Sequence, residues 1–533
     1  MSEDNVEHDE HQHDEHQRDE HQRDAERVSV EQADVVVIGG GVAGLIAARS
    51  SARNGLKVIL VDGSETLGGF VATQTVAGIR VDSGAESFAS RGGLLRPNPA
   101  VPAAKLGPVA ELIQDLGLDG RIVSPNSTGA WLQLSDRAAP LPKLTILGIP
   151  GAPLASDVRR IIGWGGALRA QLDRYQPLLR VRPETDLGGI VRRRMGQRVL
   201  DRLVTPIVQG VHSAHPDLVD VHAVLPGLTT AMTRHGSLSG AVLSLIEERG
   251  STAAAGSAVA GLSGGMFTLI EALIADCERY GVEFRMGRAV TEVAAALPRG
   301  DDGTPDEAPA PEAGKARWCA TLAPGADASA PTEIDSMAVV VATSFRSGLA
   351  LLAGLGVDTG TAADWPEPAS VDLATIVIDD ARLDAAPRGT GVLVAPGVPG
   401  VRAKALTHAT SKWPWLAEAA GPGRHVLRLS YDRAADAEPA DSVTQAEALA
   451  DAGTLLGIAL DGSAVAGFAV TRWDDSLAFA TVGHRARVEK LLTQTAELDP
   501  SLIVVGAWVA GTGLAATVTQ ARKATRGLPR TLA

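Results

Sequence analysis

The sequence contains few cysteines and few aromatic side chains. Its 533 residues include two cysteines, Cys277 and Cys319, and aromatic residues make up only 3%. Two cysteines without CxxC spacing provide neither a disulfide framework nor the thiolate set of a structural zinc site. We therefore predict no metal site, and a reducing cytoplasm is the compartment that suits this cysteine usage.

Long apolar runs are absent too, although hydrophobic residues make up 45% of the chain. No stretch approaches the roughly 18 to 20 apolar residues of a membrane-spanning helix, so we expect no integral membrane segment. The first apolar segment, Val35–Ile38, follows a polar stretch rather than a basic one, which is not the pattern of a secretory signal. The length predicts two or more lobes.

The net charge of −14 is concentrated at the N-terminus. Residues 1–27 hold eleven acidic residues and three arginines, a balance of −8, so the rest carries −6. That mild excess argues against a nucleic-acid partner. The repeats DEHQH, DEHQR and DEHQR offer almost nothing to bury, and we predict that residues 1–30 form a disordered acidic, histidine-rich tail. Its histidines either bind divalent metal loosely or belong to a solubilising extension.

A glycine turn follows the first apolar strand. In DVVVIGGGVAGLIAARSSARNGLKVILVD, from Asp34 to Asp62, the residues Gly39, Gly41 and Gly44 fit GxGxxG. The first glycine permits a tight turn, the second lets the backbone approach a pyrophosphate, and the third allows close packing of helix on strand. Asp62 ends the second strand, where an acid binds ribose hydroxyls. Strand, helix, second strand and acid in register predict a dinucleotide site.

A second glycine turn decides between NAD and FAD. Gly506, Gly511 and Gly513 precede a C-terminal helix whose amide end is suited to the negative charge that develops on a reduced flavin. An NAD dehydrogenase seldom needs such a turn at its C-terminus. If the N-terminal and C-terminal segments come together around one elongated cofactor, that cofactor is FAD. We therefore predict FAD.

The order of patterns predicts a mixed α/β and α+β fold with a discontinuous Rossmann-like domain. We expect residues 31–100, 258–345 and 495–533 to form the FAD-binding domain. Residues 101–257 are expected to be a largely helical domain with substrate-facing segments, and residues 346–494 a substrate-binding β-sheet domain.

Several motifs resemble the FAD-dependent porphyrinogen oxidases, within the wider amine oxidase and phytoene desaturase superfamily. They include the Gly68–Gly69 pair, DSGAESF at 82–88, GGMFTLIEAL at 264–273 and GAWVAGTGLAA at 506–516. The segment at 191–221 also resembles this family, and KALTHATSKWPWL at 404–416 and TVGHRARV at 481–488 resemble its actinobacterial branch. The likeness covers residues 33–525. The chain departs from the family pattern at Phe70, His212 and His215, and it has Asp62 where Glu is commoner.

The resemblance implies an enzyme of haem biosynthesis that oxidises coproporphyrinogen III to coproporphyrin III. Six electrons leave in three flavin cycles, and O2 reoxidises the flavin with release of hydrogen peroxide. Protoporphyrinogen IX is the alternative substrate. An amine oxidase or carotenoid desaturase relative, and a flavin-binding scaffold without turnover, are further alternatives. The implied partners are the porphyrinogen, O2 and neighbouring haem-pathway enzymes.

The resemblance also implies the site residues. Gly210 is expected to approach the reacting methylene through its backbone. Arg91, which follows ESFAS, either pairs with a substrate propionate or is a solvated surface residue. FAD is expected to bind without a covalent bond, at Gly39, Gly41, Val42, Ala43, Gly44, Asp62, Gly68, Gly69, Glu86, Ser87, Val290, Trp473, Val509, Gly511, Thr512 and Gly513.

Other charged residues raise narrower hypotheses. Arg402, Lys404 and Lys412 are candidates, with Arg91, for extra cations at the rim of a site that prefers the four propionates of coproporphyrinogen over the two of protoporphyrinogen. Solvated surface positions are the equal alternative for the first three. His212, His215 and His222 cluster in the sequence, either as proton-transfer groups or as structural loop residues.

Overall fold

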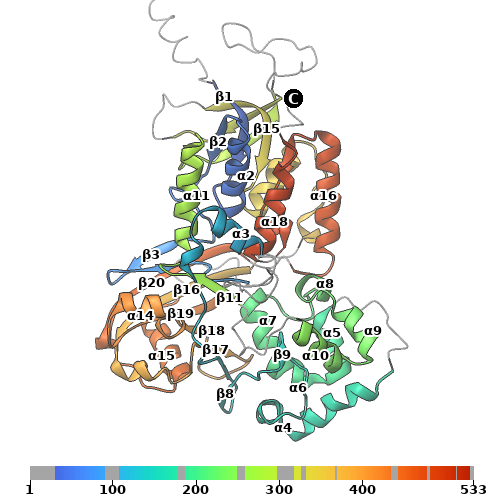
Figure 1. Cartoon of the computed structure of the whole chain (residues 1–533), viewed down its shortest axis with the longest axis vertical. Coiled ribbons are helices and arrows are strands. Elements are labelled where there is room, and N and C mark those ends of the chain that lie inside the picture. Colours follow the sequence, from blue (N-terminus) through green and yellow to red (C-terminus); the bar gives the residue numbers. More distant parts are fainter. Residues whose placement is uncertain are drawn as a thin grey trace, which may run out of the picture.

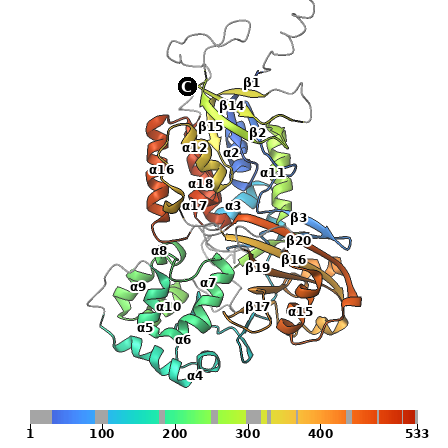
Figure 2. The same ribbon diagram turned by 180° about the vertical axis from the view of Figure 1, so that it is seen from behind.

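The computed structural model describes residues 30–89, 107–177, 186–248, 259–296, 317–325, 332–365, 369–433, 442–476, 480–511 and 513–528. Most of the predicted N-terminal tail, Arg91 and Thr512 therefore lie outside the described residues. The molecule is elongated, with one sheet and its helices at the upper end (Figure 1). A second sheet and a group of helices lie side by side at the lower end, as Figure 2 also shows.

The first sheet joins segments from both ends of the chain. Its order is β12-β2-β1-β15-β14-β13, and β21 pairs with β15. The strands are β1 (Val30–Ile38), β2 (Val58–Val61), β12 (Glu283–Arg285), β13 (Val290–Ala295), β14 (Trp318–Leu322), β15 (Glu333–Val341) and β21 (Leu502–Val504). Strands β1, β2, β12, β15 and β21 run parallel. This confirms the expected discontinuous Rossmann-like fold.

Helices cover both faces of the first sheet, which explains its continuous apolar strands. One face packs against α2 (Val42–Arg53), α11 (Phe267–Arg279) and α18 (Leu514–Thr525). The other face packs against α12 (Phe345–Gly354) and α16 (His484–Leu498). A buried ion pair, Arg49 Nε to Asp276 Oδ2 at 2.6 Å, joins α2 to α11.

The second sheet has the order β20-β16-β19-β18-β17-β7-β8. Its strands are β7 (Trp131–Gln133), β8 (Ala138–Pro140), β16 (Ala369–Asp379), β17 (Gly391–Val394), β18 (Ala405–His408), β19 (Arg424–Arg433) and β20 (Val465–Ser476). Helix α15 (Gln445–Leu456) covers one face and forms a separate core with it.

The domain boundaries predicted from the sequence differ from this arrangement in two ways. Residues 131–140 were expected in the largely helical domain, but β7 and β8 extend the second sheet, with β7 parallel to β17. Helices α12 and α16 were assigned to the domain at 346–494, but they pack on the first sheet. Three-residue strands are too short to show periodicity, and an amphipathic helix does not reveal which sheet its apolar face will meet.

The remaining helices surround one apolar core. They include α4 (Ser156–Gln171), α5 (Leu187–Met195), α7 (Thr205–His212), α9 (Leu228–His235) and α10 (Leu238–Glu248). Asp173 holds several of them together, because its buried carboxylate accepts from Arg194 Nε at 2.6 Å and from Ser239 N at 2.8 Å. Among the residues that the structure describes, no helix combines the length and apolar composition needed to cross a bilayer.

Candidate cofactor and substrate site

The first glycine turn has the geometry that its spacing predicts. Gly39 has φ +109°, and a Cβ there would lie 2.6 Å from Ala342 O. A Cβ on Gly44 would collide with Gly39 O. A Cβ on Gly41 would have no protein atom within 4 Å. Gly39 and Gly44 are therefore required by the fold itself, whereas the space beside Gly41 is open to a ligand.

Three further segments lie against this turn. Asp62, at the end of β2, accepts from Gly40 N at 2.5 Å and from Ser64 N at 2.7 Å. Gly68 N donates to Gly40 O at 2.8 Å, which brings the glycine pair beside Gly41. Arg288 N donates to Asp62 O at 3.1 Å, so the start of β13 at Val290 lies near the same acid. The residues predicted from four distant parts of the sequence are thus brought together.

Helix α2 begins at Val42, directly after the open position. The amides of its first turn have no acceptor within the helix and carry the positive end of the helix dipole. Val42 and Ala43 belong to that turn, and no side chain caps it. This is the environment in which a pyrophosphate binds.

The C-terminal glycine turn lies beside the first one. Trp508 Nε1 donates to Thr343 O at 3.3 Å, and Thr343 follows Ala342, which closes on Gly39. Gly511 and Gly513 have φ of +91° and +105°, and a Cβ on either would have no protein atom within 4 Å. Val509 is in α17 (Ala507–Ala510), between the strand and these glycines. A ligand can therefore approach the main chain at both glycine turns, which suits a long dinucleotide.

Residues 82–87 are held by charged and polar contacts with the second sheet. The buried Arg428 of β19 donates Nη2 to Gly84 O at 2.7 Å and Nη1 to Glu86 Oε2 at 2.6 Å. Lys412 forms a second ion pair with Glu86. Burial alone would raise the pKa of the Glu86 carboxyl, but Lys412 and Arg428 outweigh it and lower the pKa to about 2. The carboxylate of Glu86 is therefore charged and already paired, with Ser87 next to it.

Asp82 anchors the start of the same segment. Its carboxylate accepts from Met266 N at 3.0 Å and from Phe267 N at 3.2 Å at the beginning of α11. Burial raises the pKa of Asp82 from 3.8 to about 6, although these backbone bonds and Arg428 oppose the rise. The segment is thus attached to the start of α11 at Asp82 and to the second sheet at Glu86.

Trp473 of β20 also contacts this segment. Its Nε1 donates to Ser83 O at 2.7 Å, and its ring centroid lies 5.2 Å from that of Phe70. Phe70 is the residue that stands where the resembled family usually has a base. Here it provides an aromatic partner for Trp473.

Gly210 lies where the helical region meets the second sheet. A Cβ at this position of α7 would lie 2.7 Å from Leu393 Cδ2 of β17. Just beyond it, Lys404 Nζ contacts Ser213 Oγ at 3.0 Å. The lack of a side chain at Gly210 allows the helix to approach the sheet closely.

Each candidate rim cation is paired with an acid, so a substrate carboxylate would have to compete with that acid. Arg402 pairs with Glu447 at 2.7 Å, Lys404 with Asp432 at 2.5 Å, and Lys412 with Glu86. Sequence reasoning missed Arg428, which orders residues 84–86. The one indication in the sequence was that Arg428 stands within GRHVLRLSY, a segment with the alternating pattern of a strand.

Two of the three histidines that are close together in the sequence, His215 and His222, have side chains that the structure describes, and both are exposed. His215 is exposed and its Nδ1 accepts from Asp217 N at 3.3 Å. His222 is exposed at the start of α8 (Val221–Val224), and the side chain of His212 is outside the described part. In the described residues, no group of three or more His, Cys, Asp or Glu is arranged to hold a metal.

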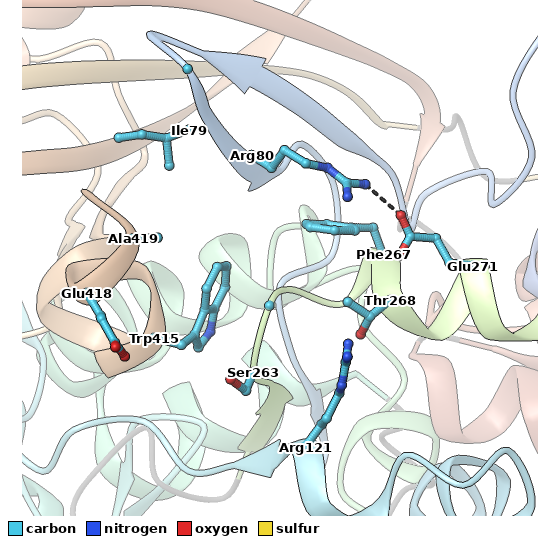
Figure 3. A pocket seen from close by; sticks show the side chains of 12 residues that line it. Ile79, Arg80, Arg121, Ser263, Phe267, Thr268, Glu271, Trp415, Glu418 and Ala419 are labelled. Carbon is cyan, nitrogen blue, oxygen red and sulfur yellow. Dashed lines mark hydrogen bonds and ion pairs between the residues drawn. The ribbon is translucent and has the colours of Figure 1, made fainter. Parts of the chain in front are cut away.

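A separate cavity of about 530 Å³ lies between α11 and α14 (Pro414–Ala420). Figure 3 shows the ion pair of Arg80 and Glu271 on one side of the cavity. Trp415 and Glu418, both of α14, lie on the other side. None of the predicted cofactor residues lines it. It is therefore distinct from the open backbone at the glycine turns.

Comparison with known proteins agrees with this geometry. The model of the flavin containing amine oxidoreductases matches residues 42–306. Over these residues the chain is similar to that family. It binds FAD, and the open backbone at Gly41, Gly511 and Gly513 fits that cofactor.

Two curated relatives align with nearly the whole flavin-containing oxidoreductase chain. Coproporphyrinogen III oxidase of Mycobacterium tuberculosis is 27% identical over 496 residues, which is 92% of this chain and 95% of the relative. The protein of the same name from Bacillus subtilis is 25% identical over 510 residues, covering 92% and 96%.

A crystal structure from Exiguobacterium sp. 255-15, of a protein named provisionally as a protoporphyrinogen oxidase, shares the fold. The TM-score is 0.72 at 22% identity, over 94% of this chain and 99% of the other.

Proposed function

We propose that this oxidoreductase converts coproporphyrinogen III to coproporphyrin III in haem biosynthesis. The observation that carries the proposal is the end-to-end match with relatives named coproporphyrinogen III oxidase. Three hydrogen pairs leave the porphyrinogen, and three O2 molecules accept them to give three hydrogen peroxide molecules. Bound FAD supplies the acceptor for each hydride.

The cofactor contacts follow from the open positions. We assign the pyrophosphate to Gly41 and the α2 N-terminus, with Val42 and Ala43, and the ribose to Asp62. The main chain at Gly511 and Gly513 would contact the flavin. Since the Glu86 carboxylate is committed to Arg428 and Lys412, its contribution would be the main chain of residues 86–87. The binding is proposed to be non-covalent.

The substrate side would lie between the second sheet and α7. Gly210 and Leu393 are in contact there, and Lys404 links Ser213 to Asp432. The main chain of Gly210 is proposed to face the methylene that is oxidised. Pairing of Arg91 with a propionate stays a prediction because Arg91 is outside the described residues.

Protoporphyrinogen IX is the second candidate. It is supported by the name of the Exiguobacterium structure and by a rice chloroplast protoporphyrinogen oxidase that is 28% identical over 228 residues. The ion pairs of Arg402, Lys404 and Lys412 remove the argument for excess rim charge. The preference for coproporphyrinogen therefore depends on the relatives. A cytoplasmic location and contacts with haem-pathway enzymes also stay predictions.

The proposal is tested by mixing the FAD-loaded enzyme with coproporphyrinogen III without oxygen. The flavin absorbance near its visible maximum should be lost, and admitting air should restore it with release of hydrogen peroxide. An enzyme whose flavin stays oxidised in excess coproporphyrinogen III would overturn the proposal. Peroxide-free reoxidation by another acceptor would overturn only the assignment of O2.

A further inference from the structure

The cavity between α11 and α14 lies where the layers of the two sheets meet. Helix α11 packs on the first sheet. Leu416 of α14 shares an apolar core with Val81 of β4 (Ile79–Asp82) and Val426 of β19. The volume of about 530 Å³ is within the range of roughly 300–1,000 Å³ of small-molecule sites, which favour boundaries of this kind.

Two aromatic rings line facing sides of the cavity. Phe267 is the first residue of α11, and Trp415 is in the first turn of α14. Figure 3 shows the two rings on opposite sides of the space. The ring of Phe267 is buried beneath the guanidinium of Arg80, whose Cζ lies 4.2 Å from the ring centroid, and Trp415 packs against the core of α14. Both rings are therefore held in place, and a planar aromatic ligand could contact them by stacking or edge to face.

Arg121 supplies this cavity with a positive charge. Its main chain is fixed at the end of the 3-10 turn Asp119–Arg121, because Ser263 N donates to Arg121 O at 2.7 Å. Its exposed side chain lines the cavity and points toward Thr268 (Figure 3). Among the residues that the structure describes, the guanidinium has neither an acidic partner nor a hydrogen-bond acceptor. A free guanidinium is suited to bidentate binding of a carboxylate.

Two acids limit the negative charge that the cavity can accept. Glu271 is paired with Arg80 at 2.7 Å. Glu418 is exposed on α14 and forms no ion pair within the described part of the chain. It lies on the side of Trp415, away from Arg121 (Figure 3). A second negative group at that end of a ligand would be repelled, so the cavity favours a monoanion over a nucleotide or a dicarboxylate.

Phe267 connects the cavity to residues 82–87. Its ring lines the cavity, and its main-chain N donates to Asp82 Oδ1 at 3.2 Å. An occupant would therefore touch a residue that also holds the start of the segment beside the cofactor site. This connection does not depend on which porphyrinogen is oxidised.

We propose that the cavity is a binding site for a planar aromatic monocarboxylate, separate from the cofactor and substrate sites. The ring system would lie between Trp415 and Phe267, and the carboxylate would accept from Arg121. The substrate side proposed above is at α7, which lies away from α14 in both ribbon views (Figures 1 and 2).

The test is isothermal titration calorimetry of the full-length, FAD-loaded protein with naphthoate as the probe. Cyclohexanecarboxylate keeps the charge but lacks the aromatic plane. A naphthalene dicarboxylate with carboxylates at opposite ends keeps the plane but adds a second charge. Both should bind several-fold more weakly than naphthoate does.

Variants locate the probe in the cavity. Arg121→Gln should weaken naphthoate binding by about tenfold or more, because a charge-assisted hydrogen bond is lost. Trp415→Leu should also weaken it, and Glu418→Gln should reduce the discrimination against the dicarboxylate. Matched controls on other surfaces are Arg485→Gln, which removes an exposed arginine of α16, and Trp164→Leu, which removes a tryptophan that is 63% exposed. Both should bind naphthoate as the unchanged protein does.

Three results would overturn the proposal. The first is an unchanged protein that does not bind naphthoate at millimolar concentration. The second is equal binding by the unchanged protein, Arg121→Gln and Trp415→Leu, which would place the probe elsewhere. The third is binding of the dicarboxylate at least as tight as that of naphthoate. Because Arg121 is exposed, its variant should fold normally, and circular dichroism checks this.

Discussion

Arg428 donates to Glu86 at 2.6 Å across 342 residues of sequence, and both side chains are largely buried. The pair joins the second sheet to the segment that starts at Asp82, whose carboxylate is bonded to the start of α11. Because Arg428 also binds Gly84 O, it fixes the backbone of a segment proposed to face the flavin. The position of this segment is therefore set by the second sheet.

Replacing Arg428 by Met should destabilise the protein strongly. Removing one partner of a buried ion pair typically costs about 3–5 kcal/mol because the other charge stays buried. Arg424→Met on the same strand is the matched control, since Arg424 pairs with Asp379 at the surface, where such a pair is worth about 0–1 kcal/mol. Urea unfolding measures both variants, and equal losses would contradict the role given to Arg428.

Gly41→Val should abolish FAD binding and leave the fold intact. The new side chain meets no protein atom within 4 Å but fills the space assigned to the pyrophosphate. Gly44→Val is the contrasting variant, because its Cβ collides with Gly39 O and should damage folding itself. Flavin released by acid, with circular dichroism of the same samples, distinguishes the two. A full complement of FAD in Gly41→Val would refute the assignment.

Asp82 should make stability depend on pH. Its folded pKa of about 6 exceeds the ordinary 3.8, so between these values the folded state binds more protons than the unfolded state. The free energy of unfolding should therefore fall as pH rises through this window, by roughly 3 kcal/mol at most. Asp82→Asn should lack that fall, while the exposed Glu418→Gln should keep it. Urea unfolding at pH 4.5 and pH 6.5 gives the comparison, and parallel curves for Asp82→Asn and the unchanged protein would contradict it.

Arg402→Gln should leave substrate choice nearly unchanged. Glu447 already neutralises Arg402 at the surface, so little charge is available for a propionate. We expect the ratio of kcat/KM for the two porphyrinogens to change by less than about twofold, since a surface pair is worth about 0–1 kcal/mol. A tenfold shift would show that Arg402 leaves Glu447 to bind the substrate.

The sequence predicted the first sheet well because its signals are local. Gly39, Gly41 and Gly44 stand at fixed spacing after an apolar strand, and Asp62 ends the next one, so each can be recognised without knowing the rest of the fold. The C-terminal turn at Gly511 and Gly513 could be added because parallel strands place their carboxyl ends at one edge.

The partners of the charged residues could not be predicted in this way. Nothing in GRHVLRLSY indicates that Arg428 meets Glu86, because that contact depends on how two sheets pack. Lys404 is a second example, because its pairing with Asp432 depends on the register of β18 against β19. Strands β7 and β8 were missed because three residues show no periodicity.

The central claim is tested most directly by comparing the two porphyrinogens as substrates in air. Porphyrin fluorescence gives kcat/KM for coproporphyrinogen III and for protoporphyrinogen IX with the same FAD-loaded enzyme. We predict oxidation of both and a higher kcat/KM for coproporphyrinogen III. Equal values, or a higher value for protoporphyrinogen IX, would contradict the proposed substrate while leaving the binding of FAD intact.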